Sequence, residues 1–319
     1  MQSDTIVHAA VVVAICTYNR AASLPALVHA LRAQHAPQPF DIFFVNNNSS
    51  DDTLSVLAKL ADEPGASLRY VTETTQGIVP ARNRVLSECV RLYEYILVMD
   101  DDEIPRPGWV VASLDALINE DAECVGGAVE VAFREASRPS WLGDELLGFL
   151  AQVDYGKEPF WVRDDSTPIW TANVGYRAQL FREGLCFDRR YNREGNAVGG
   201  GEDLELFRAL VATGARVRYR PDMVVEHHVE AWRLTRRYFL RLHYASGRKA
   251  GLYETRAFGK TIFGIPRFML AQLLRQLGRA LTLAGRPGSL RQAMNVSHAL
   301  GMIVGLRSRR RVLAQSAGI

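Results

Sequence analysis

The sequence predicts an α/β protein built on a mostly parallel sheet, and two observations support this fold class. Apolar stretches of strand length alternate with stretches of helical spacing through the first part of the chain. Three of the apolar stretches lead directly into polar clusters, as happens where parallel strands end at the ligand-binding edge of a sheet. With 319 residues and 48% hydrophobic content, the chain is large enough to bury a substantial core.

Four strands and three helices are expected to alternate in this first part. The continuous apolar stretch at residues 9–16 is typical of a strand that is covered on both faces. Short polar connections between the elements favour parallel pairing with helices on both faces of the sheet. The expected strands are 9–16, 40–46, 67–73 and 95–99, and the expected helices are 21–34, 51–62 and 79–93.

The middle and the end of the chain follow other patterns. Residues 130–191 are rich in Trp, Pro and Gly, which favours loops that shape a pocket. A helix is expected from Glu202 to a glycine cap at Gly214, followed by a strand. Two basic amphipathic helices are then expected at 233–253 and 267–285.

We therefore expect a first domain over residues 1–230 and a helical, basic extension over 231–319. Within the first domain, a regular first half of about 1–129 is expected to precede a less regular second half of about 130–230.

The charge is distributed unevenly along the chain. Residues 206–319 contain 21 Lys and Arg against 4 Asp and Glu, whereas residues 1–205 contain 17 and 31. The basic part is expected to meet an anionic surface, and the apolar face of its helices favours lipid over nucleic acid. No apolar stretch near the end reaches the ~20 residues that span a bilayer. We expect a cytoplasmic protein, peripheral on the inner face of the membrane; packing on the catalytic domain or a homodimer interface is the alternative.

The cysteines and the start of the chain bear on the compartment. Cys16, Cys89, Cys124 and Cys186 are isolated, without C-x-x-C spacing. This pattern argues against a zinc site and a disulfide framework and fits a reducing compartment. The first apolar segment is short and lacks both a basic leader and a cleavage site, so it is expected to be a strand and not a signal peptide.

Three consecutive aspartates, Asp100 to Asp102, follow the fourth expected strand, with Glu103 behind them. Carboxylates at this edge of a sheet are tolerated when a cation neutralises them. Hard oxygen ligands suit Mg²⁺ or Mn²⁺, which typically takes one or two carboxylates plus substrate phosphates. The aspartates therefore predict a divalent metal on a diphosphate; a solvated acidic turn that caps the next helix is the alternative.

Other polar motifs carry weaker signals. Arg82 lies early in a helix, where it opposes the helix dipole, so it is either a surface arginine or a partner of an anion. Glu202 and Asp203 follow three glycines at a helix start, where they could cap the helix or supply a general base. Of the adjacent histidines after a strand, His227 and His228, at most one can face the site.

The order of these motifs is more specific than any one of them. The chain reads CTYNR, VNNNSSDDT, GIVPARN, DDDE, GGGEDLELFRAL and VVEHHV, with RLT after it. Over about residues 10–247 this order resembles the family 2 glycosyltransferases, which have the GT-A fold and are usually inverting. The resemblance implies transfer of a sugar from a nucleotide donor to a hydroxyl of a glycan or lipid-linked acceptor, in polysaccharide or glycoconjugate biosynthesis.

The resemblance also implies roles for residues at matching positions. Asp102, with Asp100 and His227, would hold Mg²⁺ or Mn²⁺ on the donor diphosphate, and Asp203 of the Glu202–Asp203 pair would be the general base. The residues expected to bind the nucleotide sugar are Thr17, Asn19, Arg20, Asn46, Asn48, Arg82, Asp100 and Asp101, and those expected to grip the acceptor or the donor sugar are Trp170 and Asn173.

One of these positions departs from the family pattern. The family commonly has aspartate where this chain has Asn46. An amide oxygen can still accept a hydrogen bond from uracil N3–H, and the amide nitrogen can donate to O4. UDP therefore remains the favoured nucleotide.

Other function classes fit the motifs less well. No G-x-G-x-x-G follows the first strand, as a Rossmann dehydrogenase requires, and no P-loop signature is present. A sugar nucleotidyltransferase usually has a Gly-rich loop with Arg or Lys after the first strand, where this chain reads CTYNRAASLP. A catalytically inactive membrane-surface scaffold of the same fold is the non-enzymatic alternative, and the intact acids and Arg82 argue against it.

Overall fold

The computed structural model describes residues 10–134, 136–195, 197–255, 261–262, 265–286 and 288–316, with side chains up to residue 309. The described residues divide into two compact units. The first unit contains the chain up to Gly195 together with Gly201–Val229, and the second contains residues 197–200 and the chain from Glu230 onward.

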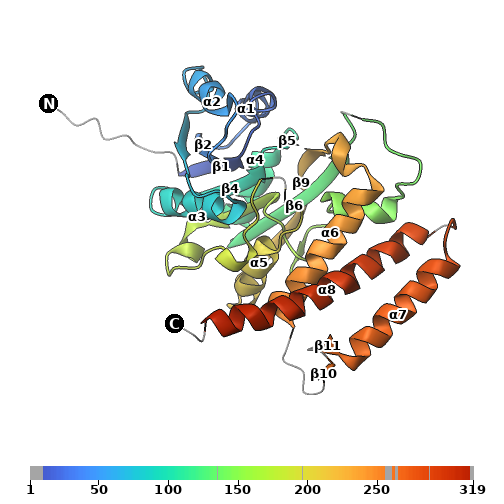
Figure 1. Cartoon of the computed structure of the whole chain (residues 1–319). Helices are drawn as coiled ribbons and strands as arrows, with labels where there is room; N and C mark the ends of the chain where they lie inside the picture. Colours follow the sequence, from blue (N-terminus) through green and yellow to red (C-terminus); the bar gives the residue numbers. More distant parts are fainter. Residues whose placement is uncertain are drawn as a thin grey trace. The chain divides into compact units, whose positions relative to one another are not determined.

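A mixed, mostly parallel sheet forms the centre of the first unit (Figure 1). Its strand order is β3-β2-β1-β4-β8-β6-β9-β5, with β7 paired to β9 off this path. Strands β1 to β4 are mutually parallel. The strands are β1 (Val11–Thr17), β2 (Phe40–Asn46), β3 (Leu68–Thr72), β4 (Tyr95–Asp100), β5 (Glu103–Pro105), β6 (Cys124–Ala132), β7 (Phe160–Trp161), β8 (Asn173–Arg177) and β9 (Val217–His228).

The helices of this unit cover both faces of the sheet. Helices α1 (Leu24–Arg32) and α2 (Thr53–Ala61) lead stepwise from β1 to β3, whereas α3 (Ile78–Cys89) returns the chain to β4 on the other side of β1. Because parallel crossovers are right-handed, this reversal places α3 on the face opposite to α1 and α2 (Figure 1). Doubly wound sheets bind ligands at such a reversal. The unit also contains α4 (Trp109–Leu114) and α5 (Glu202–Ala212).

The core of this unit lies around β1 and β2. Residues Val11–Ile15 and Ile42–Val45 have no exposed surface, because helices cover both faces of these strands. Continuous apolar runs are the pattern that such burial produces. The predicted first strand is therefore confirmed over residues 11–16, while residue 9, where the prediction begins, lies outside the described residues.

Strand β8 corrects the expectation that residues 130–191 form loops. It runs antiparallel between β4 and β6, so it breaks the parallel order of the sheet. Its sequence NVGYR is short, and the glycine in it packs against the side chains of Leu97 and Val125. A strand of this length, with a glycine at its centre, shows no alternation by which the sequence could reveal it.

The second unit is mainly helical. It contains α6 (Arg236–Lys249), α7 (Arg267–Thr282), α8 (Ser289–Ser316) and the short hairpin β10 (Thr261–Ile262) and β11 (Ile265–Pro266). A small apolar cluster joins α7 and α8, made by Ile265, Met269, Ile303 and Leu306. Among the described residues, no helix combines the length and the apolar character needed to cross a bilayer.

Four glycines bring α8 into close backbone contact with α6 and with the π-helical turn Ala250–Glu254 that follows it. They stand four residues apart on each side, Gly247 and Gly251 against Gly301 and Gly305. A Cβ built at any of them would lie 2.0–2.2 Å from a carbonyl oxygen of the facing segment. The two backbones therefore approach as closely as glycine alone permits.

This packing gives a prediction with a control of opposite sign. Gly301→Ala is expected to destabilise the protein by about 1–3 kcal/mol, because the added methyl group meets Tyr244 O and forces the helices apart. Gly278→Ala on α7 has no atom within 4 Å of the added Cβ, and is expected to stabilise by up to about 1 kcal/mol through helix propensity alone. Urea denaturation followed by circular dichroism measures both. A Gly301→Ala protein as stable as the wild type would refute the close contact.

Candidate active site

The carboxyl ends of β1, β2 and β4 meet at one edge of the sheet. Cys16 of β1 is paired with Asp100 of β4, and Thr17 is paired with Asn46 of β2. The three polar clusters that were noted in the sequence therefore share an edge, as predicted. The clusters lie beside the reversal of strand order between β1 and β4.

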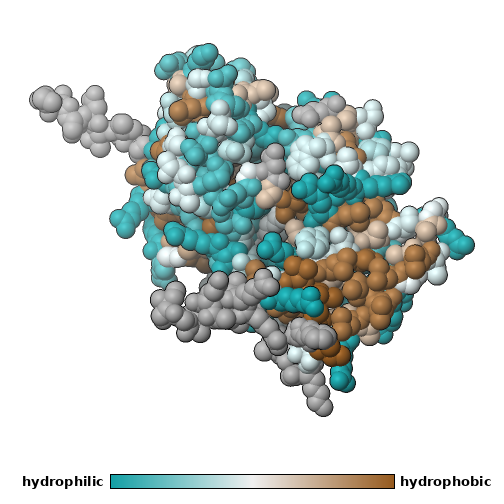
Figure 2. All heavy atoms as spheres, in the orientation of Figure 1, coloured by the Kyte–Doolittle hydropathy of each residue, from teal (hydrophilic) through white to brown (hydrophobic). Residues whose placement is uncertain are grey.

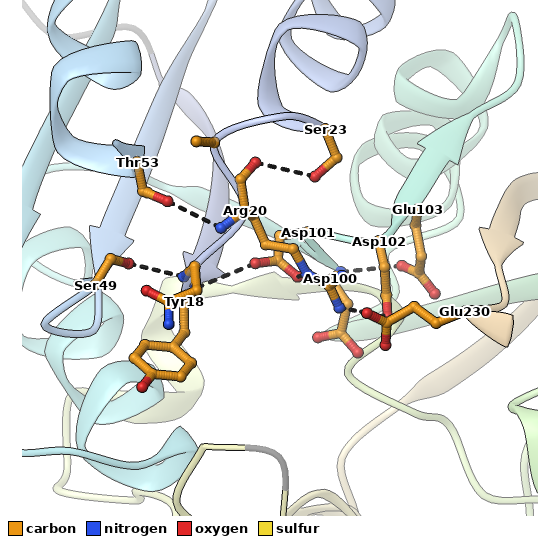
Figure 3. A network of polar contacts seen from close by, with 12 residues as sticks. Tyr18, Arg20, Ser23, Ser49, Thr53, Asp100, Asp101, Asp102, Glu103 and Glu230 are labelled. Atoms are coloured by element: carbon orange, nitrogen blue, oxygen red, sulfur yellow. Dashed lines mark hydrogen bonds and ion pairs between the residues drawn. The ribbon is translucent and has the colours of Figure 1, made fainter. Parts of the chain in front are cut away.

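Two of the three aspartates, Asp101 and Asp102, face Arg20, which comes from the loop after β1 (Figure 3). Arg20 Nε lies 3.3 Å from Asp101 Oδ1, and Nη2 lies 3.4 Å from Asp102 Oδ2. Asp101 also accepts a hydrogen bond from the Tyr18 amide at 3.3 Å. The loop after β1 and the turn after β4 are thus tied together by charge and by backbone contacts.

The carboxylates at this edge of the sheet are crowded, and burial and their mutual repulsion raise the pKa of two of them, Asp101 and Glu103. Burial, with the charges of Asp102 and Asp100 added, raises the pKa of Asp101 to about 7, while Arg20 opposes the rise. Glu103 has 1% of its surface exposed, and its Oε2 accepts the Asp100 amide at 3.0 Å. Burial and the neighbouring aspartates raise the pKa of Glu103 well above its usual value. A cation placed here would relieve the same repulsion.

His227 reaches this edge from β9. Strand β5 pairs with β9 in a register that sets Glu103 opposite His227, and the His228 amide donates to Asp102 O at 2.8 Å. His227 Nδ1 lies 2.8 Å from Leu150 O, which can only accept, so Nδ1 carries the proton. In neutral His227 the lone pair is then on Nε2, 3.5 Å from Asp102 Oδ2.

Arg82 is a buried link between two carboxylates. Its Nη1 donates to Glu202 Oε1 at 2.7 Å and its Nη2 to Asp100 Oδ1 at 3.2 Å. Arg82 is 4% exposed and Glu202 is 2% exposed, so this is a desolvated ion pair. Burial works against the charge of Arg82, but Asp100 and Glu202 outweigh it and raise its pKa. The sequence left a surface arginine and a partner of an anion as alternatives for Arg82, and the structure pairs it with two carboxylates of the protein.

Asp203 follows Glu202 in the first turn of α5. Its Oδ1 accepts the Leu204 amide at 2.8 Å. Burial, with the Glu202 charge added, raises the pKa of Asp203 to about 6, and Arg82 opposes the rise. A carboxylate with a pKa near neutrality is suited to accept a proton during a reaction. Glu202 accepts the hydrogen bond of Arg82 through Oε1, so in this structure it positions Arg82.

Asn47 and Asn192, two residues that the sequence did not single out, fix the loop that leads into α3, the helix of Arg82. Asn47 Oδ1 accepts the Gly77 amide at 2.7 Å, and its Nδ2 donates to Thr75 O at 2.8 Å. Asn192 Oδ1 accepts the Val79 amide at 3.2 Å and lies 2.2 Å from where a Cβ at Gly77 would be. Gly77 is thus required by both its φ of 129° and its space. Asn47 lies inside the motif VNNNSSDDT, but its neighbours Asn46 and Asn48 were the residues predicted to bind the nucleotide sugar.

Four of the residues expected to bind the nucleotide sugar lie at the ends of β1 and β2 or in the loops that follow them. Asn46 is 2% exposed, and its Oδ1 accepts the Ser49 amide at 3.2 Å. Asn19 and Asn48 take left-handed conformations, with φ of 52° and 56°. Asn19 Oδ1 accepts the Ser50 amide at 2.8 Å, which joins the two loops. Thr17, the last residue of β1, is 2% exposed.

The two residues expected to grip a sugar, Trp170 and Asn173, also have contacts within the protein. Asn173 Nδ2 donates to Ala128 O and Met223 O, both at 2.8 Å, and Oδ1 accepts Trp109 Nε1–H at 2.7 Å. Both polar hydrogens of this buried amide therefore join β8 to β6 and β9, and its contact with a sugar stays a prediction. Trp170 is half-buried and packs against the core.

A complete metal site is absent from the described side chains. No three His, Cys, Asp or Glu residues among them converge closely enough to enclose a metal ion. Asp102 and His227 are the pair that approaches this arrangement. Their geometry fits two ligands of an ion whose other ligands come from elsewhere.

The sequence of this chain is similar to sequences of known glycosyltransferases. The model of the family described as "Glycosyl transferase family 2" matches residues 12–185. Hyaluronan synthase of Pasteurella multocida is 24% identical over 248 residues, 70% of this chain and 25% of the relative. Pre-mycofactocin glycosyltransferase of Mycobacterium tuberculosis is 27% identical over 155 residues, 48% of this chain and 30% of the relative. The chain thus spans less than a third of the length of these curated relatives.

Solved structures agree on the fold. The Pyrobaculum calidifontis mannosyltransferase PcManGT, in complex with GDP-Man and Mn²⁺, superposes with a TM-score of 0.54 and 18% identity over 98% of this chain and 80% of that chain. Staphylococcus aureus TarS 1–349 superposes with a TM-score of 0.51 and 14% identity over 96% and 91%. The sheet and its flanking helices are those of the GT-A fold, and because the family model covers more than half of the sequence, the chain belongs to glycosyltransferase family 2.

Proposed function

We propose that this glycosyltransferase is an inverting enzyme, which transfers a sugar from a nucleotide diphosphate donor, UDP-sugar being favoured, to a hydroxyl of a glycan or lipid-linked acceptor. The observation that carries the proposal is the linked set of charges at one sheet edge, Asp100–Asp102 with His227, and the Glu202–Asp203 pair joined to them by Arg82. Similarity to hyaluronan synthase and to chondroitin synthase supports a role in polysaccharide or glycoconjugate biosynthesis.

The donor set fits Mg²⁺ or Mn²⁺. A metal-bound histidine usually donates its other ring N–H to a backbone carbonyl, as His227 does to Leu150. Asp102 Oδ2 and His227 Nε2 would then be two ligands, with Asp100 nearby, and the donor diphosphate would complete the coordination. A divalent ion bound here would neutralise charge on the departing diphosphate. Mn²⁺ in the structures of PcManGT and of GalNAc-T7 with UDP supports the same choice.

The chain's own groups then have defined tasks. Asp203 takes the proton from the acceptor hydroxyl, and that oxygen attacks the anomeric carbon from the face opposite to the diphosphate. The bond to the diphosphate breaks with its electron pair, so the configuration inverts and the leaving group needs no proton. Asp203 is suited to this task because burial raises its pKa to about 6. Glu202 holds Arg82 and so fixes the start of α5.

Calorimetric titration with UDP, with GDP as the second nucleotide, tests this proposal. The wild-type protein is expected to bind UDP in the presence of Mn²⁺ and to lose it when EDTA is added. Asp102→Asn removes the charge of one proposed ligand and is expected to weaken metal-dependent binding at least about tenfold, in the range of coordinating-shell substitutions. Glu88→Gln, on the outer face of α3, is the control. If the affinity for the nucleotide is the same with and without metal, and the same in Asp102→Asn, the inactive-scaffold alternative would be favoured.

We further propose that the second unit binds an anionic membrane surface. Residues 230–319 contain 17 Lys and Arg against 2 Asp and Glu. Figure 2 shows hydrophobic surface gathered over α7 and α8. On α7 the exposed fractions are 69% for Leu274, 40% for Leu277 and 78% for Leu281, which stand on one helical face with Arg275 and Arg279 beside it. Two copies would bring like charges together, so lipid is favoured over a homodimer.

Sedimentation with lipid vesicles measures this contact. Wild-type protein is expected to bind vesicles with 30 mol% anionic lipid, as about 1 kcal/mol per basic residue near the surface accumulates. Vesicles of neutral lipid, or high salt, should weaken the binding. Replacing Leu274 and Leu281 with Gln should release the protein, whereas Leu92→Gln, which changes an exposed leucine of the first unit, should not. Dimers that dissociate on the same substitution, without any lipid binding, would show a protein interface instead.

A further inference from the structure

The guanidinium of Arg20 lies beside Asp102, a residue that the proposed function makes a ligand of the metal ion (Figure 3). Arg20 Nη2 and His227 Nε2 approach the same oxygen, Asp102 Oδ2, at 3.4 and 3.5 Å. Arg20 Nε is also 3.3 Å from Asp101 Oδ1. In this state the charge that compensates Asp102 is therefore supplied by the protein itself.

We propose that Arg20 is an exchangeable counter-ion: it pairs with Asp102 in the resting protein and moves its Nη2 to a phosphate oxygen when metal and diphosphate bind together. The inference rests on the proposed function, which puts the metal at Asp102 and His227. A divalent ion between these two side chains would lie close to the guanidinium, and two cations at such a distance repel unless an anion separates them. The diphosphate is that anion, and a guanidinium suits phosphate oxygens.

The contacts around Arg20 allow the exchange with little movement. Its backbone is held at both sides, since its amide donates to Thr53 Oγ1 at 2.9 Å and its carbonyl accepts Ser23 Oγ–H at 3.2 Å (Figure 3). Asp101, fixed by the Tyr18 amide, can keep Nε while the end of the guanidinium turns. The loop therefore stays in place while the end of the Arg20 side chain moves.

This arrangement predicts that metal and nucleotide assist each other. Metal alone has to compete with Arg20 for Asp102, so it binds weakly. A diphosphate draws Arg20 away and supplies further ligands, so the pair binds better than either alone. Such coupling is reciprocal, because the free energy is shared by the two ligands. The resting protein thus discriminates against free metal and in favour of a metal-bound nucleotide diphosphate.

Binding of Mn²⁺, followed by the resonance signal of the free ion, tests the exchange without catalysis. The proteins are the wild type, Arg20→Gln, Arg20→Lys and Arg84→Gln, whose arginine pairs with Glu88 on the surface of α3. Arg20→Gln is expected to bind Mn²⁺ alone about tenfold more tightly than the wild type, and UDP at saturating Mn²⁺ about tenfold more weakly, within the usual range of coupling between sites. Arg20→Lys keeps the charge and should retain the weak binding of Mn²⁺ alone. Arg84→Gln should match the wild type in both titrations.

The outcomes separate this inference from the proposed function. If the wild type binds Mn²⁺ and UDP together, but Arg20→Gln gains no affinity for Mn²⁺ alone, the exchange is refuted and the metal site stands. If Arg20→Gln weakens both titrations, Arg20 supports the site without competing for it, and the exchange is again refuted. If no protein binds Mn²⁺ with UDP or GDP, both proposals fail. Opposite changes in the two titrations are the result that supports the exchange.

Discussion

Replacing Asp203 with asparagine is expected to lower kcat about 10³-fold, within the range of general-base contributions, with nucleotide affinity largely unchanged. Asparagine has the same size, and its amide oxygen can still accept the Leu204 amide at the start of α5. It cannot take a proton from the acceptor hydroxyl. The release of UDP from a UDP-sugar in the presence of acceptor measures kcat, and calorimetry measures nucleotide affinity in the same preparation.

The pH dependence identifies the base more directly. The pKa of Asp203 is raised to about 6 by burial, with the Glu202 charge adding to the effect. Because the pKa is raised, the protonated form accumulates as the pH falls through about 6, and the base is lost below that value. The wild-type kcat/KM is expected to fall tenfold per pH unit there. Glu205→Gln, two residues further along α5 and paired with Arg208, should keep this profile. Full activity in Asp203→Asn would assign the base to another group.

The sequence predicted the parallel part of the fold because that part is governed by local pattern. Buried strands between helices produce continuous apolar runs, and Val11–Ile15 is such a run in both sequence and structure. The carboxyl ends of parallel strands lie at one edge of a sheet, and the pairing of Cys16 with Asp100 is an instance of this. The shared edge of the polar clusters could therefore be expected before any coordinates were known.

The rest of the sheet depends on contacts that are distant in sequence. Asn173 illustrates this, since its partners Trp109, Ala128 and Met223 lie 64, 45 and 50 residues away. A polar residue beside a tryptophan in a loop-like region indicates a sugar site as readily as a core hydrogen-bond network. The amide is distinguished only by its buried partners, which no local pattern records.

The partners of Arg82 were also hidden in the sequence. Its place early in α3 opposes the helix dipole and predicts an anion, without saying which one. Glu202 is 120 residues away and follows three glycines, a pattern that equally suits a helix cap. Their pairing depends on how α3 and α5 meet in space. It makes Arg82 a structural link between Asp100 and α5, while the nucleotide contact that the family resemblance implies stays a prediction.

Replacing Arg82 with methionine is expected to destabilise the protein by about 3–5 kcal/mol, because it leaves the buried Glu202 without its partner. Glu202→Met should cost a similar amount, since Arg82 would lose the partner that lies 2.7 Å from Nη1. Denaturant unfolding followed by tryptophan fluorescence measures the difference. Arg84→Met, on the surface of the same helix, breaks an exposed pair with Glu88 and should cost at most about 1 kcal/mol.

The double variant Arg82→Met with Glu202→Met separates the ion pair from the cost of an unpaired charge. If each single change is dominated by an orphaned buried charge, removing both groups together should cost well below the sum, with a coupling of at least about 2 kcal/mol. Asp100 does not offset this result, because its side chain is 35% exposed and water can solvate it when Arg82 is gone. Additive costs would mean that Arg82 and Glu202 stabilise the fold through separate contacts. In that case the link from Asp100 through Arg82 to Glu202 would not explain how the aspartates are held in place relative to the start of α5.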